Sequence, residues 1–180
     1  YLEEEQILFS NDAFGQHYST NFKFDDENDL SELLYEAKKY YANILMPFNK
    51  LVVKALDNLG LLPIRMIAPS HGLIWRAHIA DILSLYKKWS AGETDPLVLV
   101  VYDSMWGSTE MMARRILEGL TAGGIKAKLF RMADSDKSEL IAELLTARGL
   151  ICGSSTLNNG MLPTIAAVLY YVKGLKPINK

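Results

Sequence analysis

The stretch that decides the fold is LVLVVYDSMWGST, residues 97–109. It opens with a continuous β-prone run, Leu97 to Tyr102, which is typical of a strand covered on both faces. A loop rich in glycine and hydroxyl residues follows, and helical periodicity begins at Thr109 and continues to Leu120. A strand, a loop and a helix in this order predict the first unit of a parallel α/β sheet.

The rest of the second half alternates in the same way. We expect a strand over 126–130, a helix capped by Ser135 or Asp136 and stopped by Gly149, a strand over 150–153, and a helix opened by Pro163. In the helix from Thr109 we expect Met112, Ile116 and Leu120 to face the core. The alternation predicts a doubly wound parallel sheet with right-handed crossovers and its first strand in the middle, in the order 2-1-3.

The first half has a different pattern. A strand over 7–9 leads to Asp12, a helical stretch over 29–58 is broken at Pro47 into two packed helices, and a strand over 65–68 leads to His71. A further amphipathic helix extends to Trp89. The turn-rich segment from Ser90 to Pro96 then separates the halves, so we divide the chain into residues 1–90, a linker over 91–96, and residues 97–180.

Composition excludes several classes of function. The chain has 180 residues, 49% of them hydrophobic, and a net charge of −2, which predicts a globular protein. No stripe of Lys and Arg suits nucleic acid, and no apolar run approaches the roughly 20 residues that cross a bilayer. Without a charged and then apolar leader, we expect a soluble, cytoplasmic protein. The single cysteine, Cys152, lies in an apolar run, and we expect it to be a buried thiol with a packing role.

The loop after the first strand of the sheet suits a phosphate group. Its residues are Ser104, Met105, Trp106, Gly107, Ser108 and Thr109. Free N–H groups and the positive end of the helix dipole attract an anion there, the hydroxyls add donors, and glycine permits close approach. The loop lacks the Gly-Lys-Ser/Thr ending of nucleotide-triphosphate loops, so a monophosphate fits better. An ordinary capped turn explains this loop equally well when it is considered alone.

A second polar loop follows the strand over 150–153. Its candidate residues are Ser155, Thr156, Leu157, Asn158, Asn159 and Gly160. In the order 2-1-3 both loops lie at the same edge of the sheet, where α/β proteins bind ligands. One loop can hold the phosphate while the other bonds the polar rim of a flat ring, with Trp106 and Leu157 as apolar contacts. The alternative is a common polar connection before Pro163.

Two candidate metal ligands follow strands in the first half. Asp12 and His71 each lie among small or turn residues, and carboxylate and imidazole groups suit iron, zinc or manganese. Either residue alone is more commonly a cap or turn residue. His17 and His78 are further histidines whose ordinary role is a partly exposed side chain, and His17 is the closer to Asp12 in sequence.

Three stretches together resemble the flavodiiron proteins. They are FSNDAFG over 9–15, APSHGLIWR over 68–76 and YDSMWGST over 102–109, and they occur in the same order as in that family. The segments YYANIL over 40–45 and STLNN over 155–159 are also similar to the nitric-oxide-reducing, flavorubredoxin-like branch. The resemblance extends over essentially the whole chain.

The resemblance implies an α/β fold class with two incomplete domains. The first is the C-terminal part of a metallo-β-lactamase-like αββα domain that holds two irons, with Asp12 as the bridging aspartate and His71 as the last histidine ligand. The second is the N-terminal part of a flavodoxin-like domain that binds FMN. The other iron ligands are expected before Tyr1 and a third FMN loop after Lys180, so we expect the chain alone to be inactive.

The implied activity is that of an oxidoreductase. The full-length protein would reduce nitric oxide to nitrous oxide, or dioxygen to water, with electrons passed through FMN from a donor such as rubredoxin or a reductase. A head-to-tail homodimer is also implied. The main alternative is an FMN-binding electron carrier whose front domain is only a scaffold. A zinc hydrolase ranks last, because hydrolysis gives no reason for a flavin loop.

Overall fold

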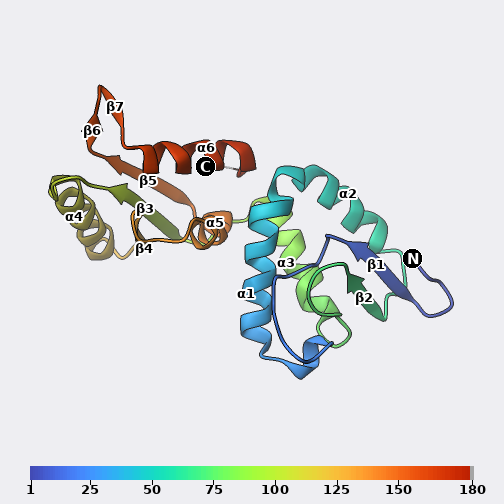
Figure 1. The fold of residues 1–180 in the computed structure, drawn as a ribbon. Helices are drawn as coiled ribbons and strands as arrows, with labels where there is room; N and C mark the ends of the chain where they lie inside the picture. The colour runs from blue at the N-terminus through green and yellow to red at the C-terminus, as the bar shows by residue number, and fades with distance from the viewer. Residues whose placement is uncertain (179–180) are drawn as a thin grey trace. The chain divides into compact units, whose positions relative to one another are not determined.

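The chain forms two compact units in a computed structural model that describes residues 1–178. The first unit is Tyr1–Ala91 and the second is Gly92–Lys180 (Figure 1). Each unit has its own sheet and helices.

The first unit holds a two-stranded parallel sheet and three α-helices. Its elements are β1 (Ile7–Asn11), a 3-10 turn (Asp25–Glu27), α1 (Leu30–Tyr40), a π-helical turn (Tyr41–Leu45), a 3-10 turn (Met46–Phe48), α2 (Asn49–Leu59), β2 (Met66–Pro69) and α3 (Ile79–Ala91). Strands β1 and β2 pair in parallel, and α2 packs against α3. Both strands therefore run in the same direction, and the loops that follow them meet at one edge of this sheet.

The predicted break at Pro47 is present, but it is extended. Helix α1 passes into the π-helical turn before the 3-10 turn in which Pro47 occupies an early position. A proline in the interior of a regular helix would remove a hydrogen bond and clash with the preceding turn. The change of helix type places Pro47 where that conflict does not arise, and α2 then begins at Asn49.

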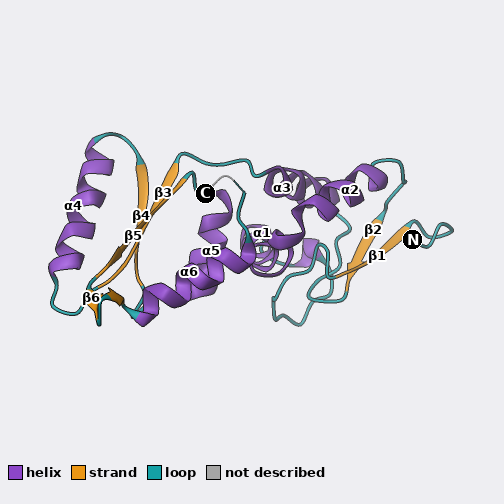
Figure 2. Ribbon diagram, turned by 90° about the horizontal axis from the view of Figure 1, so that it is seen from above, coloured by secondary structure: helices purple, strands orange, loops and turns teal. Residues whose placement is uncertain are grey.

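The second unit is a parallel sheet between helices. Its elements are β3 (Leu97–Asp103), α4 (Ser108–Ala122), β4 (Lys126–Arg131), α5 (Lys137–Thr146), β5 (Gly149–Ser154), β6 (Thr156–Leu157), β7 (Gly160–Met161) and α6 (Pro163–Leu175). The strand order is β4-β3-β5, which confirms the predicted 2-1-3 order. Figure 2 shows α4 on one face of the sheet and α5 and α6 on the other.

The prediction of which face of α4 points toward the core is partly wrong. Leu120 packs on the sheet as expected, but Met112 and Ile116 are exposed, and the buried position is Ala113. The small side chain of Ala113 lets the helix lie close to Tyr102. Helix α4 is therefore rotated about its axis relative to the prediction, so that Met112 and Ile116 lie outside its contact with the sheet.

The packing role expected for Cys152 is also wrong, because the side chain is exposed. Within the described residues β5 pairs only with β3, so Cys152 lies on a strand at the edge of the sheet. An apolar run in the sequence does not distinguish such an edge strand from a central one.

The short hairpin of β6 and β7 was not predicted. Asn158 and Asn159 connect the strands with φ angles of 50° and 60°. Asparagine tolerates this left-handed region, and two consecutive residues there form the turn that suits a two-residue hairpin. The second polar loop is therefore partly ordered by its own backbone pairing.

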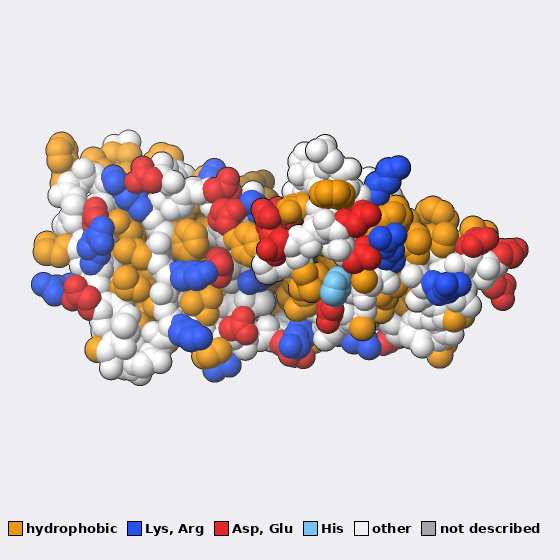
Figure 3. Space-filling view, turned by 90° about the horizontal axis from the view of Figure 1, so that it is seen from below, with side chains coloured by type: hydrophobic (Ala, Val, Ile, Leu, Met, Phe, Trp, Pro, Cys, Tyr) orange, Lys and Arg blue, Asp and Glu red, His pale blue; other side chains and the backbone are white. Residues whose placement is uncertain are grey.

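The surface carries charged side chains of both signs. Figure 3 shows acidic and basic side chains interspersed on the face drawn, with apolar groups between them. Among the described residues, every helix is too short or too polar to pass through a lipid bilayer.

Candidate functional site

The loop between β3 and α4 presents backbone amides at a helix start. Gly107 precedes α4 with φ of +86°, and no side chain caps the first turn of this helix. The amide of Gly107 donates to Ser104 Oγ at 3.0 Å, which folds the loop back on itself. Gly107 has open space around its Cα, since an added Cβ would meet nothing within 4 Å. The loop is thus open to a ligand on the side of the helix start.

A buried carboxylate holds the base of this loop. Asp103 Oδ1 accepts from the Ser104 amide at 2.9 Å, and Oδ2 accepts from Thr164 Oγ1 at 2.6 Å. Thr164 belongs to the first turn of α6, so Asp103 connects the end of β3 to a second helix. These contacts occupy both oxygens of Asp103, which gives it a structural role in the loop.

The second polar loop lies directly beside the first. Ser155 Oγ accepts from the Met105 amide at 3.2 Å and shares a hydrogen bond with Thr109 Oγ1 at 3.0 Å. A Cβ added at Gly153 would lie 3.2 Å from Thr109 Cγ2, so the strand end and α4 are closely packed. The structure therefore brings the two sequence-predicted loops together.

Most of the predicted ligand residues are accessible. The exposed residues are Met105, Gly107, Ser108, Thr156, Asn158, Asn159 and Gly160, and the half-buried ones are Ser104, Thr109, Ser155 and Leu157. The side chain of Trp106 is 89% exposed. Neither loop contains a lysine or an arginine. An anion held here would be bound by amides, hydroxyls and the helix dipole, and the exposed indole offers a face to an aromatic ring.

Asp12 and His71 lie side by side in the first unit. Asp12 Oδ1 is 3.4 Å from His71 Nε2, and both side chains are 49% exposed. Asp12 follows β1 and His71 follows β2, and the two loops are joined by hydrogen bonds from the Ser70 amide to Asn11 O and from the Gln16 amide to His71 O. Parallel pairing of the two strands thus places the carboxylate and the imidazole together.

Two aromatic residues complete this cluster. The ring centroids of His17 and His71 are 5.8 Å apart, and the ring of Tyr40 lies 4.9 Å from His17 and 5.8 Å from His71. Burial, and then the charge of Asp12, raise the pKa of the Tyr40 hydroxyl. Tyr40 was not among the predicted site residues, because its place on the buried face of α1 does not distinguish it from a core tyrosine.

His78 makes its contacts with other residues of the first unit. Its Nδ1 is 3.0 Å from Asp81 Oδ2 at the start of α3, and its amide donates to buried Asp25. These contacts are those of a residue that orders a helix start. Of the two spare histidines, only His17 contacts the Asp12 and His71 pair.

The pair fits a metal as part of a coordination shell. A carboxylate and a neutral imidazole are donors that iron and zinc accept, and both are accessible. Within residues 1–178, however, no three His, Cys, Asp or Glu side chains are grouped so that they would hold a metal ion. Asp12 and His71 therefore supply two donors and need others to complete a site.

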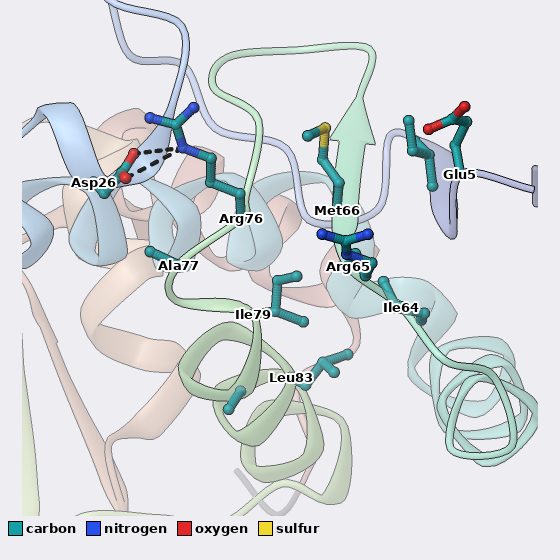
Figure 4. Close-up of a pocket in the computed structure, with 11 residues that line it drawn as sticks. Glu5, Asp26, Ile64, Arg65, Met66, Arg76, Ala77, Ile79 and Leu83 are labelled. Carbon is teal, nitrogen blue, oxygen red and sulfur yellow. Dashed lines mark hydrogen bonds and ion pairs between the residues drawn. The ribbon is translucent and has the colours of Figure 1, made fainter.

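One hollow of the first unit is lined by none of the predicted site residues. It has a volume of about 910 Å³, and its walls include Glu5, Arg65 and Arg76 (Figure 4). Arg76 Nε contacts Asp26 Oδ1 at 2.9 Å, so one of its two arginines is already paired. The size of a hollow is thus a poor guide to chemistry in this chain.

The chain is similar in sequence and structure to several known proteins. The flavodoxin family model matches residues 100–176. The whole chain aligns with the nitric oxide reductase of Moorella thermoacetica at 46% identity and with the anaerobic nitric oxide reductase flavorubredoxin of Escherichia coli at 44%. The rubredoxin oxygen:oxidoreductase of Desulfovibrio gigas matches 98% of the chain with a TM-score of 0.95 and 36% identity. Along its whole length, this chain is similar to flavodiiron proteins.

Structural similarity to flavodiiron proteins extends over both units. The flavodiiron protein of Giardia intestinalis matches 98% of the chain with a TM-score of 0.94 and 38% identity. The chain is therefore an α/β protein with a flavodoxin domain, preceded by an α/β segment that also occurs in flavodiiron structures. It covers 46% and 38% of the two reductases and 45% and 44% of the two solved chains, so it spans less than half the length of these relatives.

Proposed function

We propose that this chain is part of a longer flavodiiron oxidoreductase that reduces nitric oxide to nitrous oxide, or dioxygen to water, with electrons passed through FMN. One observation supports it above all: a carboxylate–imidazole pair and a pair of anion-ready loops occur in one chain. That chain aligns along its whole length with two proteins named as nitric oxide reductases.

The flavodoxin domain would hold FMN by its two ends. The amides at the start of α4 and the hydroxyls of Ser104, Ser108 and Thr109 would bind the phosphate, whose charge the helix dipole favours. Ser155 to Gly160 would contact the rim of the flavin ring, with Met105, Trp106 and Leu157 beside it. Bound FMN supplies a carrier that accepts and passes electrons singly or in pairs.

The first unit would contribute two protein donors to a diiron centre. Asp12 would bridge the metals, and His71 would bind one of them through a neutral ring nitrogen. Bound iron supplies the binding and polarisation of the small gas substrate. The buried ring of Tyr40 lies beside both histidines, so it would pack against the side chains that hold the metal.

The same proposal includes partners and organisation. Rubredoxin is part of the names of two relatives, and we propose a rubredoxin or a reductase as the electron donor. We also propose a head-to-tail homodimer, which the family resemblance implies. The two compact units support a division into a diiron part over 1–90 and an FMN part over 97–180 with a linker over 91–96. We also propose a cytoplasmic location.

One observation favours a second candidate, an FMN-binding electron carrier with a scaffold domain. Two donors alone do not make a metal site, and the described residues contain no larger group. Iron and flavin analysis of the full-length protein separates the two candidates. The diiron enzyme predicts FMN together with about two irons per subunit, as in other two-metal sites. FMN without iron would overturn it in favour of the carrier.

A further inference from the structure

Phe14 adopts an unusual backbone conformation two residues after Asp12. Its φ is +65°, and the residue is 2% exposed. An aromatic side chain rarely occupies the left-handed region, because its Cβ crowds the backbone there. Such a conformation persists only where the surrounding structure determines it, and it is found most often at functional sites.

Three buried side chains hold the Phe14 peptide in place. The Phe14 amide donates to the Tyr86 hydroxyl at 2.6 Å. The Phe14 carbonyl accepts from Trp75 Nε1 at 2.8 Å and from Gln16 Nε2 at 3.3 Å. All three side chains are 0% exposed, so no water competes for these hydrogen bonds.

Gln16 also holds the loop that carries His71. Its Oε1 accepts from the Leu73 amide at 2.7 Å, and its Nε2 donates to the Leu73 carbonyl at 3.1 Å. The amide side chain thus bonds the backbone of both loops at once. The close fit extends to Gly72, where an added Cβ would lie 1.8 Å from Gln16 Oε1.

The contacts of the Asp12 and His71 side chains fix their spacing only in part: the Ser70 hydroxyl lies 3.4 Å from Asp12 Oδ1, and the rings of His17 and Tyr40 lie beside His71. The Asp12 and His71 side chains are half exposed, and the atoms nearest to each other are 3.4 Å apart. Their relative position therefore depends mainly on the backbone of the two loops. The polar atoms of Tyr86, Trp75 and Gln16 all bond that backbone.

We propose that Gln16, Trp75 and Tyr86 are positioning residues that set the spacing of Asp12 and His71 for a shared metal. This inference rests on the proposed function, because it requires these two side chains to be metal ligands. The three side chains bond the backbone of the two loops and would not themselves be ligands of the metal. They act through the backbone at Phe14 and Leu73, as outer partners of ligands do in other metal sites.

The test uses substitutions that remove polar atoms and retain bulk. Tyr86→Phe keeps the ring that packs 4.3 Å from Phe14 and removes the acceptor of the Phe14 amide. Gln16→Met keeps the chain length and removes every hydrogen bond of the amide. The matched control is Tyr41→Phe, because Tyr41 is also buried and packs 4.9 Å from Tyr86, but its hydroxyl bonds Asn49 of α2.

The measurement is the dissociation constant of ferrous iron in the full-length protein, by competition with a chelator, together with flavin content and melting temperature. We expect Tyr86→Phe and Gln16→Met to raise this constant about 10-fold to 100-fold, as loss of outer partners does elsewhere. Flavin content should stay at the wild-type level, because the flavin loops belong to the other unit. Tyr41→Phe should lower the melting temperature without changing the iron constant.

Each contrary result has a distinct meaning. Wild-type iron affinity in Tyr86→Phe overturns the positioning role, even if Gln16→Met does not fold. An equal loss of affinity in Tyr41→Phe also overturns it, because the effect would then follow from general destabilisation. A wild-type full-length protein that binds no iron overturns the proposed function, and the positioning role with it.

Discussion

At the scale of single residues, the two loops that carry Asp12 and His71 depend on backbone conformations that only a few residue types allow. Gly72 has φ of +81°, and a side chain there would collide with buried Gln16. Glycine meets both demands, since it has no Cβ and enters the left-handed region freely. The residue that follows His71 is therefore fixed by geometry as much as the ligand itself.

Replacing Gly72 by alanine should destabilise the first unit. We expect Gly72→Ala to lower the free energy of unfolding by about 1–3 kcal/mol from backbone strain, and by more where Gln16 is displaced. Thermal unfolding of the full-length protein measures the effect. Gly60→Ala is the control, because Gly60 has φ of −60° and its added Cβ would make only ordinary contacts of 3.6 Å and 3.8 Å. Equal melting temperatures for both variants would contradict the prediction.

Residue type and position after a strand indicated Asp12 and His71 as separate candidate ligands, and only the family resemblance placed them in one site; the structure has them 3.4 Å apart. The same signals could not find Tyr86, because its hydroxyl bonds a residue 72 positions earlier in the chain. Tyr40 was missed for a similar reason, since its contact with both histidines depends on how α1 crosses the loops. Buried polar contacts between distant segments leave no periodic trace in a sequence.

At the scale of elements, helix α1 begins with a charged cap. Asp29 Oδ1 accepts from the Ser31 hydroxyl and from the amides of Ser31 and Glu32. These hydrogen bonds favour the ionised form, the hydroxyl most, so they lower the pKa of Asp29 in the folded protein. The cap therefore stabilises the fold above the unfolded pKa, and this stabilisation is lost as the pH falls through the lowered folded pKa.

The pH dependence of this cap is testable. Asp29→Ala should melt at a lower temperature than wild type at neutral pH, and the difference should shrink on acidification from about pH 7 to about pH 2. Asp29→Asn is the control, since asparagine caps a helix without titrating. A wild-type-to-alanine difference that stays constant across this range would refute the charged cap.

The two polar loops of the flavodoxin domain are joined through Ser155, which bonds both Met105 and Thr109. We expect Ser155→Ala to raise the dissociation constant of FMN in the full-length protein about fivefold to tenfold. The reason is that the hydrogen bonds that align the two loops are lost, at a cost similar to that of about one hydrogen bond. Titration of the apoprotein by flavin fluorescence gives this value. Ser84→Ala on the exposed surface of α3 should have no effect, and equal affinities in all three proteins would count against the assignment of the second loop.

Most elements could be predicted because their apolar periods are long and regular. The apolar run of β3 and the alternation of strands with helices led to the correct sheet order. The rotation of α4 about Ala113 could not be predicted, since two adjacent stripes of the helix are apolar. The hairpin at Asn158 and Asn159 escaped notice because its strands have only two residues each.

At the scale of the whole molecule, the chain combines two kinds of site that differ in chemistry. The first unit offers a carboxylate and an imidazole. The two polar loops of the second unit offer amides and hydroxyls and contain no lysine or arginine. The proposed function assigns a flavin to the second site and a metal to the first. Similarity to flavodiiron proteins agrees with this combination.

The most direct test of the proposed function is the anaerobic consumption of nitric oxide by the full-length protein and its Asp12→Ala variant, with reduced electron donor in excess. We predict that the wild type consumes nitric oxide or, in a parallel assay, dioxygen. The variant should lose this activity and its iron while it keeps a full complement of FMN. Turnover at the wild-type rate by Asp12→Ala would contradict the account.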